Sequence, residues 1–276
     1  MRKLLPVARV AERKGYAELI DPGSIDPDKL RRLHAVNYVD AFLNGEGRLA
    51  SAQGWPWTQE IRDGVLAMNA GQLAAAENAL RYGIAANVAQ GFHHACFSSG
   101  MGYCTFNGLA LVAQEFPHLK VCVLDCDEHG GNGTEEFTRR LPNLCNVTIN
   151  GSSFGCRSSG RSISINLEPV TGCFDVYLSA LQSAFGRIAE WRPDLVLYQA
   201  GADPHIDDPL GSLGMTTEQL FRRDQAVFEF CKESCFPTFF VLAGGYQEPL
   251  EEKLVPLHVN TFKAAHEVYF ASRGQR

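Results

Sequence analysis

The sequence lacks the segments that would place the protein in a membrane or on nucleic acid. None of its apolar runs approaches the eighteen or so residues that a membrane-spanning helix requires. Lysine and arginine form no cluster, and the formal net charge of −6 argues against general binding to phosphate backbones. The N-terminus is too short and too charged for a signal peptide. We therefore expect a cytoplasmic protein with no direct nucleic-acid or membrane partner.

The nine cysteines include no CxxC pair, and several lie within apolar stretches. In a small secreted domain such a number would indicate disulfides, but in this chain of 276 residues we interpret them as mostly reduced core thiols. The hydrophobic content of 45% is enough for a large core, and the chain contains no internal repeat, linker or low-complexity segment. We therefore predict a single domain over residues 1–276.

Apolar runs of strand length alternate with stretches of helical periodicity. Strands are expected over residues 84–90, 121–124, 146–149, 195–199 and 238–242. Helices are expected over 4–14, 28–43, 59–82, 104–115, 135–140 after a cap at Thr134, 175–191, 216–235 after a capping box, and 260–272. Residues 150–164 are expected to form a long loop rich in Gly, Ser and Arg. This alternation predicts a three-layer α/β fold whose mostly parallel sheet has helices on both faces.

The segment VCVLDCDEHGGNGT, residues 121–134, begins as a buried strand and changes abruptly into acids, an imidazole and glycines. Because side chains alternate along a strand, Asp125, Asp127 and His129 should project to one side and Cys126 and Glu128 to the other. A carboxylate and an imidazole two residues apart can bind one cation. Taken alone, however, the segment is explained equally well as a polar strand end whose acids cap the next helix.

Other expected strands also end in residues capable of chemistry, and ligands in doubly wound sheets bind beyond the carboxyl ends of the strands. These residues are His93 and His94, Asp125 to His129, Asp203, and Tyr246. Asp127, His129 and Asp203 would supply two oxygens and one nitrogen, a ligand set that suits zinc with one position open for water and substrate. The coincidence of several strand ends favours a catalytic metal site.

Each partner residue also has an ordinary structural explanation. Asp203 in Ala-Asp-Pro is typical of a turn, and adjacent histidines commonly divide into one buried hydrogen-bonding residue and one surface residue. His93 and His94 can share a pocket, as general acid and base, only if residues 91–95 already form a loop. Tyr246 follows two glycines, where it is either a half-buried aromatic or a donor to a developing oxyanion.

The order and spacing of five segments resemble the zinc-dependent histone deacetylase superfamily, which has the arginase/deacetylase fold. The chain is most similar to the bacterial and class IV-like members. The matching segments are GFHHA (91–95), GYCTFN (102–107), VLDCDEHGGNGT (123–134), LVLYQAGADPHIDDPLG (195–211) and LAGGY (242–246). This resemblance implies a deacetylase that hydrolyses the amide of an acylated amine, such as an acetyl-lysine peptide or protein or an acetylated polyamine.

The resemblance also implies a role for each site residue. Zinc would be bound by Asp127, His129 and Asp203, and the oxyanion by Tyr246. His94 would be the general base and acid, His93 its electrostatic partner, and the two would be oriented by Asn132 and Asp125. Gly102, Tyr103 and Leu210 would line the acyl-lysine tunnel. A potassium ion would lie among Asp125, Asp127, His129, Thr148 and Ile149.

Several features depart from the family pattern. The family's first strand and rim loop have no counterpart before residue 4, so we expect a more open pocket or a weaker activity. Gly130 stands where many members have His or Gln, Glu128 replaces an apolar residue, and the loop 150–164 differs. Two alternatives stay open: an arginase-like hydrolase with two manganese ions, which needs further carboxylates, and a catalytically silent protein that binds acylated amines.

Overall fold

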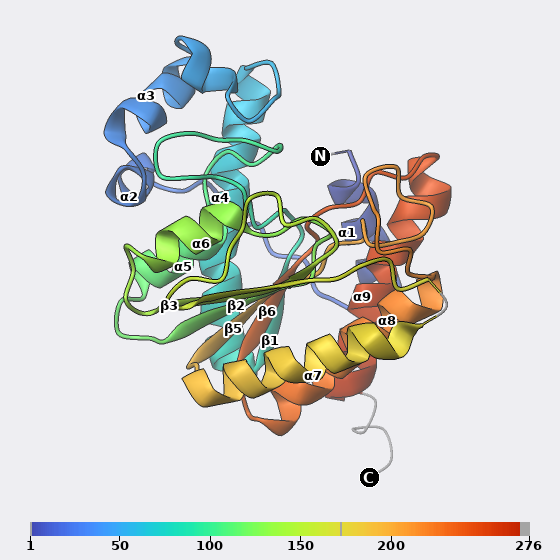
Figure 1. Ribbon diagram of the computed structural model, residues 1–276. Helices are drawn as coiled ribbons and strands as arrows, with labels where there is room; N and C mark the ends of the chain where they lie inside the picture. Colours follow the sequence, from blue (N-terminus) through green and yellow to red (C-terminus); the bar gives the residue numbers. More distant parts are fainter. Residues whose placement is uncertain (1, 172, 271–276) are drawn as a thin grey trace.

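One sheet of six parallel strands forms the centre of the computed structural model, which describes residues 2–171 and 173–270 (Figure 1). Its strand order is β1-β6-β5-β2-β3-β4, and every neighbouring pair is parallel. The strands are β1 (Ile84–Asn87), β2 (Val121–Asp125), β3 (Leu144–Asn150), β4 (Ser162–Asn166), β5 (Leu195–Gln199) and β6 (Thr238–Val241). The predicted α/β fold with a parallel central sheet is confirmed.

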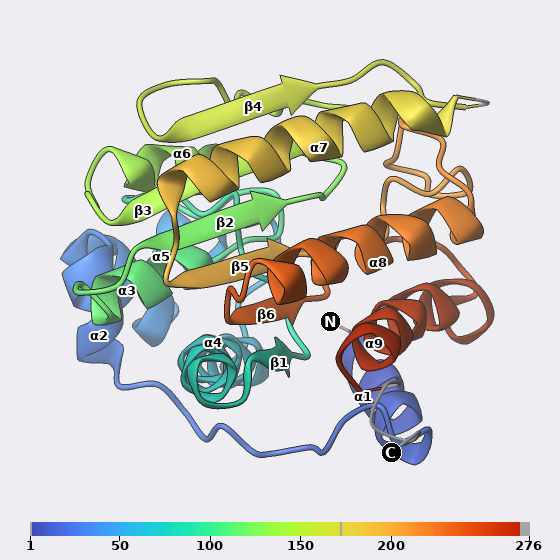
Figure 2. The same ribbon diagram turned by 90° about the horizontal axis from the view of Figure 1, so that it is seen from below.

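Helices cover both faces of this sheet (Figure 2). The core on one face includes residues of α1 (Leu4–Arg13), α7 (Phe174–Trp191), α8 (Thr217–Glu233) and α9 (Val255–Phe270). The core on the other face includes residues of α2 (Pro27–Leu33), α3 (Val36–Asn44), α4 (Gln59–Tyr82), α5 (Gly108–Glu115) and α6 (Asn132–Thr138). Strand β2 shows the reason, because Cys122 and Leu124 belong to the first core while Val121 and Val123 belong to the second.

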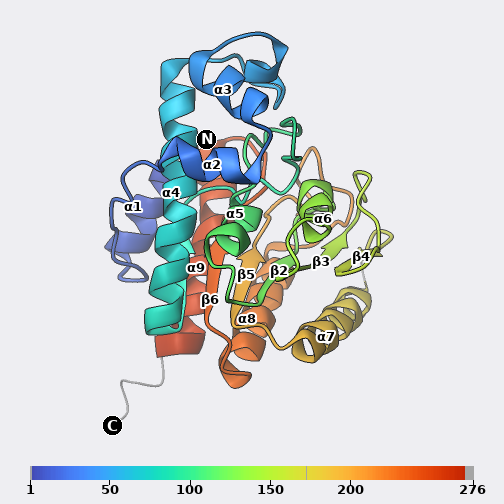
Figure 3. The same ribbon diagram turned by 90° about the vertical axis from the view of Figure 1, so that its left-hand side faces the viewer.

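The prediction of a single helix over 28–43 is wrong, since the chain forms two helices there, α2 and α3. The break lies at His34, whose backbone is extended. The His34 ring donates through Nδ1 to the carbonyl of Cys96 at 3.0 Å, and its Nε2 accepts from the N–H of Asn107 at 3.1 Å. These bonds to a distant loop replace the helical continuation. Beyond the break, α3 and the start of α4 project together away from the sheet (Figure 3).

Two helices near the expected site begin at other residues than predicted. Helix α5 starts at Gly108 rather than at residue 104, because the side chain of Asn107 caps it by accepting from the N–H of Ala110 at 2.9 Å. Helix α6 starts at Asn132, so Thr134 lies inside it and is not its cap. Strand β1 ends at Asn87, three residues early, and the histidine segment that follows is loop.

The expected loop 150–164 is partly wrong, because it contains the start of β4. The Ser-Ile alternation of SISIN, residues 162–166, is a period-2 pattern typical of a strand, and β4 pairs with β3 at the sheet edge. Asn146 and Asn150 of β3 donate side-chain hydrogen bonds to Ser162 and Ser164 of β4. These polar cross-strand pairs explain why hydrophobicity alone did not reveal the strand.

The remaining elements agree closely with expectation. Helix α4 and strand β5 have the predicted bounds, and Thr216 with Gln219 forms the predicted capping box of α8. Helix α9 begins at Val255, earlier than expected, after a π-helical turn over Leu250–Leu254, and its predicted end at residue 272 lies outside the described residues. No helix in the described part of the chain is long and apolar enough to cross a membrane.

Candidate active site

The segments that follow β2, β5 and β6 lie side by side because these three strands are adjacent in the sheet. Their backbones stay hydrogen-bonded past the strand ends: the N–H of Cys126 donates to the carbonyl of Gln199, and the N–H of Ala202 donates to Gly244, each at 3.0 Å. Asp127, Asp203 and Gly244 are therefore brought together from three separate parts of the sequence.

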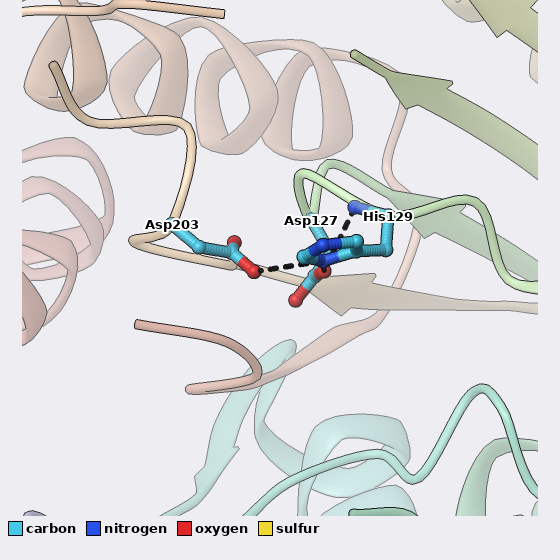
Figure 4. Close-up of side chains that lie close together, drawn as sticks. All are labelled: Asp127, His129 and Asp203. Carbon is cyan, nitrogen blue, oxygen red and sulfur yellow. Dashed lines mark hydrogen bonds and ion pairs between the residues drawn. The ribbon is translucent and has the colours of Figure 1, made fainter. Parts of the chain in front are cut away.

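Asp127, His129 and Asp203 form one compact cluster (Figure 4). The Nδ1 atom of His129 lies 3.3 Å from Oδ1 of Asp127 and 3.3 Å from Oδ2 of Asp203. The candidate ligand atoms of the three residues all lie within 4.8 Å of one another. The structure thus brings together the three residues expected to bind a metal.

Main-chain donors fix the orientation of both carboxylates. Oδ2 of Asp127 accepts from the N–H of Gly244 at 2.8 Å, and Oδ1 of Asp203 accepts from the N–H of Glu128 at 3.1 Å. The second oxygen of Asp203, Oδ2, is buried, accepts from no main-chain N–H, and has only the ion-pair contact to Nδ1 of His129 at 3.3 Å, outside hydrogen-bond geometry. A buried carboxylate oxygen without a donor fits a site that binds a cation.

The electrostatics of the cluster favour a bound positive charge. Burial, together with the charge of Asp127, raises the pKa of Asp203 to about 7. Burial would lower the pKa of His129, but its bonds to the two carboxylates outweigh this effect and raise the pKa to about 11. The pKa of Asp127 is lowered despite its burial, because of His93 and His129. Two oxygens and one imidazole nitrogen suit zinc, so the donor set fits the expected metal.

His93 and His94 lie in a loop and face the same pocket, as required if both serve one site. Their ring centroids are 3.9 Å apart, and both rings line a cavity of about 10 Å³, room for roughly one water, beside Asp127. Nδ1 of His93 is 2.7 Å from Oδ2 of Asp125 at the end of β2. Burial would lower the pKa of His93, but Asp125 and Asp127 more than compensate, so the pKa is raised.

His94 has a different hydrogen-bond partner from His93, and its pKa is lowered where that of His93 is raised. Its Nδ1 lies 2.7 Å from Oδ1 of Asn132, whose amide nitrogen is 3.4 Å from Sδ of Met101. An amide oxygen only accepts, so Nδ1 of His94 must be the donor and Nε2 keeps its lone pair. Burial, together with the charge of His93, lowers the pKa of His94 well below its ordinary value. A neutral imidazole with a free Nε2 is a competent proton acceptor.

Tyr246 lines the same cavity from the loop after β6. Its pKa is raised, first by burial and then by the charges of Asp203 and Asp127. The phenol therefore keeps its proton at neutral pH and can donate a hydrogen bond.

The residues expected to line a substrate tunnel lie at different depths. Gly102 borders the cavity with a φ of +53°, and a Cβ there would lie 2.6 Å from Cδ2 of His94, so the position requires glycine. The ring centroid of Tyr103 is 6.1 Å from that of Tyr246. Leu210 is 47% exposed and is not among the residues that line the cavity.

Three of the residues expected near a potassium ion lie at the carboxyl ends of two neighbouring strands. Asp125 of β2 is in register with Thr148 of β3, and Ile149 follows at the carboxyl end of the same strand. Thr148 and Ile149 are fully buried.

Three contacts at the site were not anticipated from the sequence. The ring centroid of Phe154 lies 4.1 Å from that of His94 with the two rings tilted, and the ring centroid of Trp55 lies 4.9 Å from that of Tyr103. Lys3 is buried and donates to the carbonyls of Ala243 and Gly244 at 2.6 and 3.0 Å. A lone aromatic in a Gly/Ser loop was the available signal for Phe154, whereas no local pattern pointed to Lys3.

Comparison with known proteins then gives the family. A model of the histone deacetylase domain matches residues 2–262. The chain belongs to the histone deacetylase family. This match spans the whole site described above.

Similar proteins include a histone deacetylase, an acetylpolyamine amidohydrolase and an uncharacterized protein. Histone deacetylase 2 of Arabidopsis thaliana is 32% identical over 256 residues, which cover 86% of this chain and 65% of the relative. Acetylpolyamine amidohydrolase 1 of Pseudomonas aeruginosa is 24% identical, and the match covers 87% of this chain and 84% of the relative. An uncharacterized protein of Picosynechococcus sp. is 29% identical, and the match covers 91% of this chain and 89% of the relative.

A solved structure confirms the fold. The crystal structure of acetylpolyamine aminohydrolase from Burkholderia pseudomallei matches with a TM-score of 0.81 at 18% identity, covering 96% of this chain and 90% of that one. The fold is therefore the arginase/deacetylase fold that the sequence predicts.

Proposed function

We propose that this member of the histone deacetylase family is a zinc-dependent amidohydrolase that removes the acetyl group from an acetylated amine. The observation that carries the proposal is the position of His94, which lines the same cavity as Asp127 and Tyr246 and whose Nε2 is free because Nδ1 is bonded to Asn132. The printed names of the relatives, a histone deacetylase and an acetylpolyamine amidohydrolase, support the same reaction class.

The proposed zinc ligands are Asp127, His129 and Asp203, the one group in the described part of the chain that has metal-binding geometry. When bound, zinc would polarise the substrate carbonyl and lower the pKa of a water molecule. A two-metal, arginase-like site would need a second group of this kind, so we favour one metal per chain.

The two histidines divide the proton chemistry in our proposal. Nε2 of His94 accepts a proton from the attacking water and later delivers it to the leaving amine nitrogen, while Nδ1 stays bonded to Asn132. His93, paired with Asp125, holds a positive charge next to this ring. That charge disfavours early protonation of His94 and strengthens it as an acid once it has taken the proton.

Tyr246 completes the site in this proposal. Its phenolic O–H donates a hydrogen bond to the carbonyl oxygen of the substrate as that oxygen gains negative charge. The phenol lines the cavity and keeps its proton, because burial and the nearby carboxylates raise its pKa. A preformed donor needs no reorganisation during the reaction.

For the substrate we propose two classes, acetyl-lysine in a peptide and an acetylated polyamine. Gly102, Tyr103 and Leu210 would form the walls around the acylated chain. We also retain the proposal of a potassium ion near Asp125, Asp127, His129, Thr148 and Ile149, where it would support the loop of the zinc ligands.

The proposal is tested by incubating the purified protein with a fluorogenic acetyl-lysine amide and with an acetylated diamine. We expect turnover of at least one substrate, and a hydroxamate chelator should abolish it. If neither substrate is turned over although each binds, the protein is a silent acyl-amine binding protein and the proposal fails.

A further inference from the structure

Asp208 is a buried acid to which the mechanism above assigns no role. Its side chain lies in the loop after β5 and is 5% exposed. Oδ2 accepts from the main-chain N–H of Tyr246 at 2.7 Å, and Oδ1 accepts from the N–H of Leu210 at 3.0 Å. One carboxylate therefore joins the loop that carries the phenol to the loop that carries an expected wall of the substrate site.

The loop of Tyr246 has few other anchors. Gly244 is held firmly: its N–H donates to Asp127, and its carbonyl accepts from the N–H of Ala202 and from Lys3. The next residue, Gly245, has a φ of +132°, a conformation that only glycine adopts readily. Because this permissive residue separates Tyr246 from the anchored Gly244, the anchors at Gly244 do not fix the direction of the phenol.

The bond from Tyr246 to Asp208 supplies the missing constraint. A hydrogen bond to a charged acceptor is stronger than one between neutral groups, and this one is buried. We propose that Asp208 is a positioning residue, which holds the backbone of Tyr246 so that its phenolic O–H points at the reacting carbonyl. This inference rests on the proposed role of Tyr246 as the oxyanion donor.

Three variants separate positioning from general stability. Asp208→Ala removes both acceptor oxygens and should lower kcat by roughly 10- to 100-fold with little change in KM, since a misplaced donor weakens only the transition state. Asp208→Asn keeps one acceptor oxygen and should recover part of the loss. The matched control is Asp207→Ala, which removes the exposed neighbouring acid whose nearest cation, Lys253, is 4.0 Å away. It should leave kcat unchanged.

A double-mutant cycle with Tyr246→Phe provides the decisive readout. If Asp208 acts through the phenol, Asp208→Ala should cost at most about twofold when the phenol is already absent. An equal loss in both backgrounds would overturn the proposal, because it would indicate general damage to the site. Normal kcat in Asp208→Ala would overturn it as well.

Hydrogen exchange gives a second readout that does not depend on turnover. The amide of Tyr246 should exchange slowly in the starting protein, much faster in Asp208→Ala and at an intermediate rate in Asp208→Asn, while the amides of β5 keep their protection. Unchanged protection at Tyr246 would refute the proposed contact. A protein that turns over no acylated amine would instead refute the proposed function and leave the exchange result standing.

Discussion

The floor and the rim of the site are built in different ways. On the floor, Asp127 and Asp203 are 2% and 0% exposed, and main-chain N–H groups from other loops hold both carboxylates. At the rim, Trp55, Tyr103 and Phe154 are 39%, 37% and 39% exposed. The floor is thus fixed by directional hydrogen bonds in a buried place, whereas the rim consists of half-exposed rings.

This difference separates the chemistry from the choice of substrate. A buried carboxylate needs its particular donors, so few residues can replace Asp127 or Asp203. Ring contacts tolerate other aromatic side chains, so Trp55 and Phe154 are free to differ among relatives. We infer that the floor determines the reaction and that the rim determines which acylated amine reaches it.

The largest expected effect breaks the floor. Asp127→Ala removes an expected metal ligand and leaves the N–H of Gly244 without its acceptor. We expect loss of bound zinc and a fall in kcat/KM of at least roughly 1,000-fold. Metal analysis and steady-state kinetics check both. Asp207→Ala, an exposed acid in the loop after Asp203, is the control, and a zinc-replete, active Asp127→Ala would contradict the floor's assigned role.

A second change leaves the proposed metal ligands intact and removes only the proposed proton carrier. His94→Ala should retain zinc but lower kcat by roughly 100- to 10,000-fold, because it removes the imidazole whose Nδ1 is bonded to Asn132 and whose Nε2 is free to accept a proton. His118→Ala, an exposed histidine, serves as the control. Near-normal turnover with zinc bound would show that proton transfer occurs elsewhere.

A third test concerns His34, which supports the segment between Cys96 and Asn107 that carries Tyr103. Burial lowers the pKa of His34 to about 4, against about 6.5 in an unfolded chain. Between these values the unfolded state binds a proton that the folded state does not, so stability falls as the pH falls. From pH 7 to about 4.5 this residue should cost roughly 2 to 3 kcal/mol of unfolding free energy. Urea unfolding should show that His34→Gln, but not His118→Gln, lacks this part of the loss.

The smallest expected effect lies at the rim. The ring of Trp55 packs at a tilt against that of Tyr103, so Trp55→Ala should raise KM by roughly 2- to 10-fold for an acetylated peptide while leaving kcat nearly unchanged. A minimal acetylated amine that ends inside the tunnel should be unaffected, and Trp55→Phe should recover most of the loss. A fall in kcat for every substrate would show that the rim acts on the chemistry, against the separation proposed above.

The sequence was enough to predict the sheet and the floor of the site, but not the contacts between distant loops. The sheet, its parallel strands and the meeting of Asp127, His129 and Asp203 were predictable, because short apolar runs mark buried strands and parallel strands end at one edge. The break at His34 was not, since it depends on bonds to Cys96 and Asn107, which lie 62 and 73 residues away in the sequence.

A strand held by polar side chains and a contact between distant loops also could not be predicted from the sequence. Strand β4 escaped prediction because its serines pair with asparagines of β3 rather than with apolar side chains. The anchoring of Tyr246 by Asp208 spans 38 residues and leaves no local pattern. Such contacts become visible only when the loops are placed together.

Whether a single catalytic metal binds on the floor of the site is decided by adding metal back to protein stripped with a chelator. Deacetylation of an acetylated amine should recover in proportion to added zinc and stop rising at one equivalent per chain, whereas Asp203→Ala should recover none. Recovery that needs two equivalents of manganese, or turnover that persists in the stripped protein, would contradict the account.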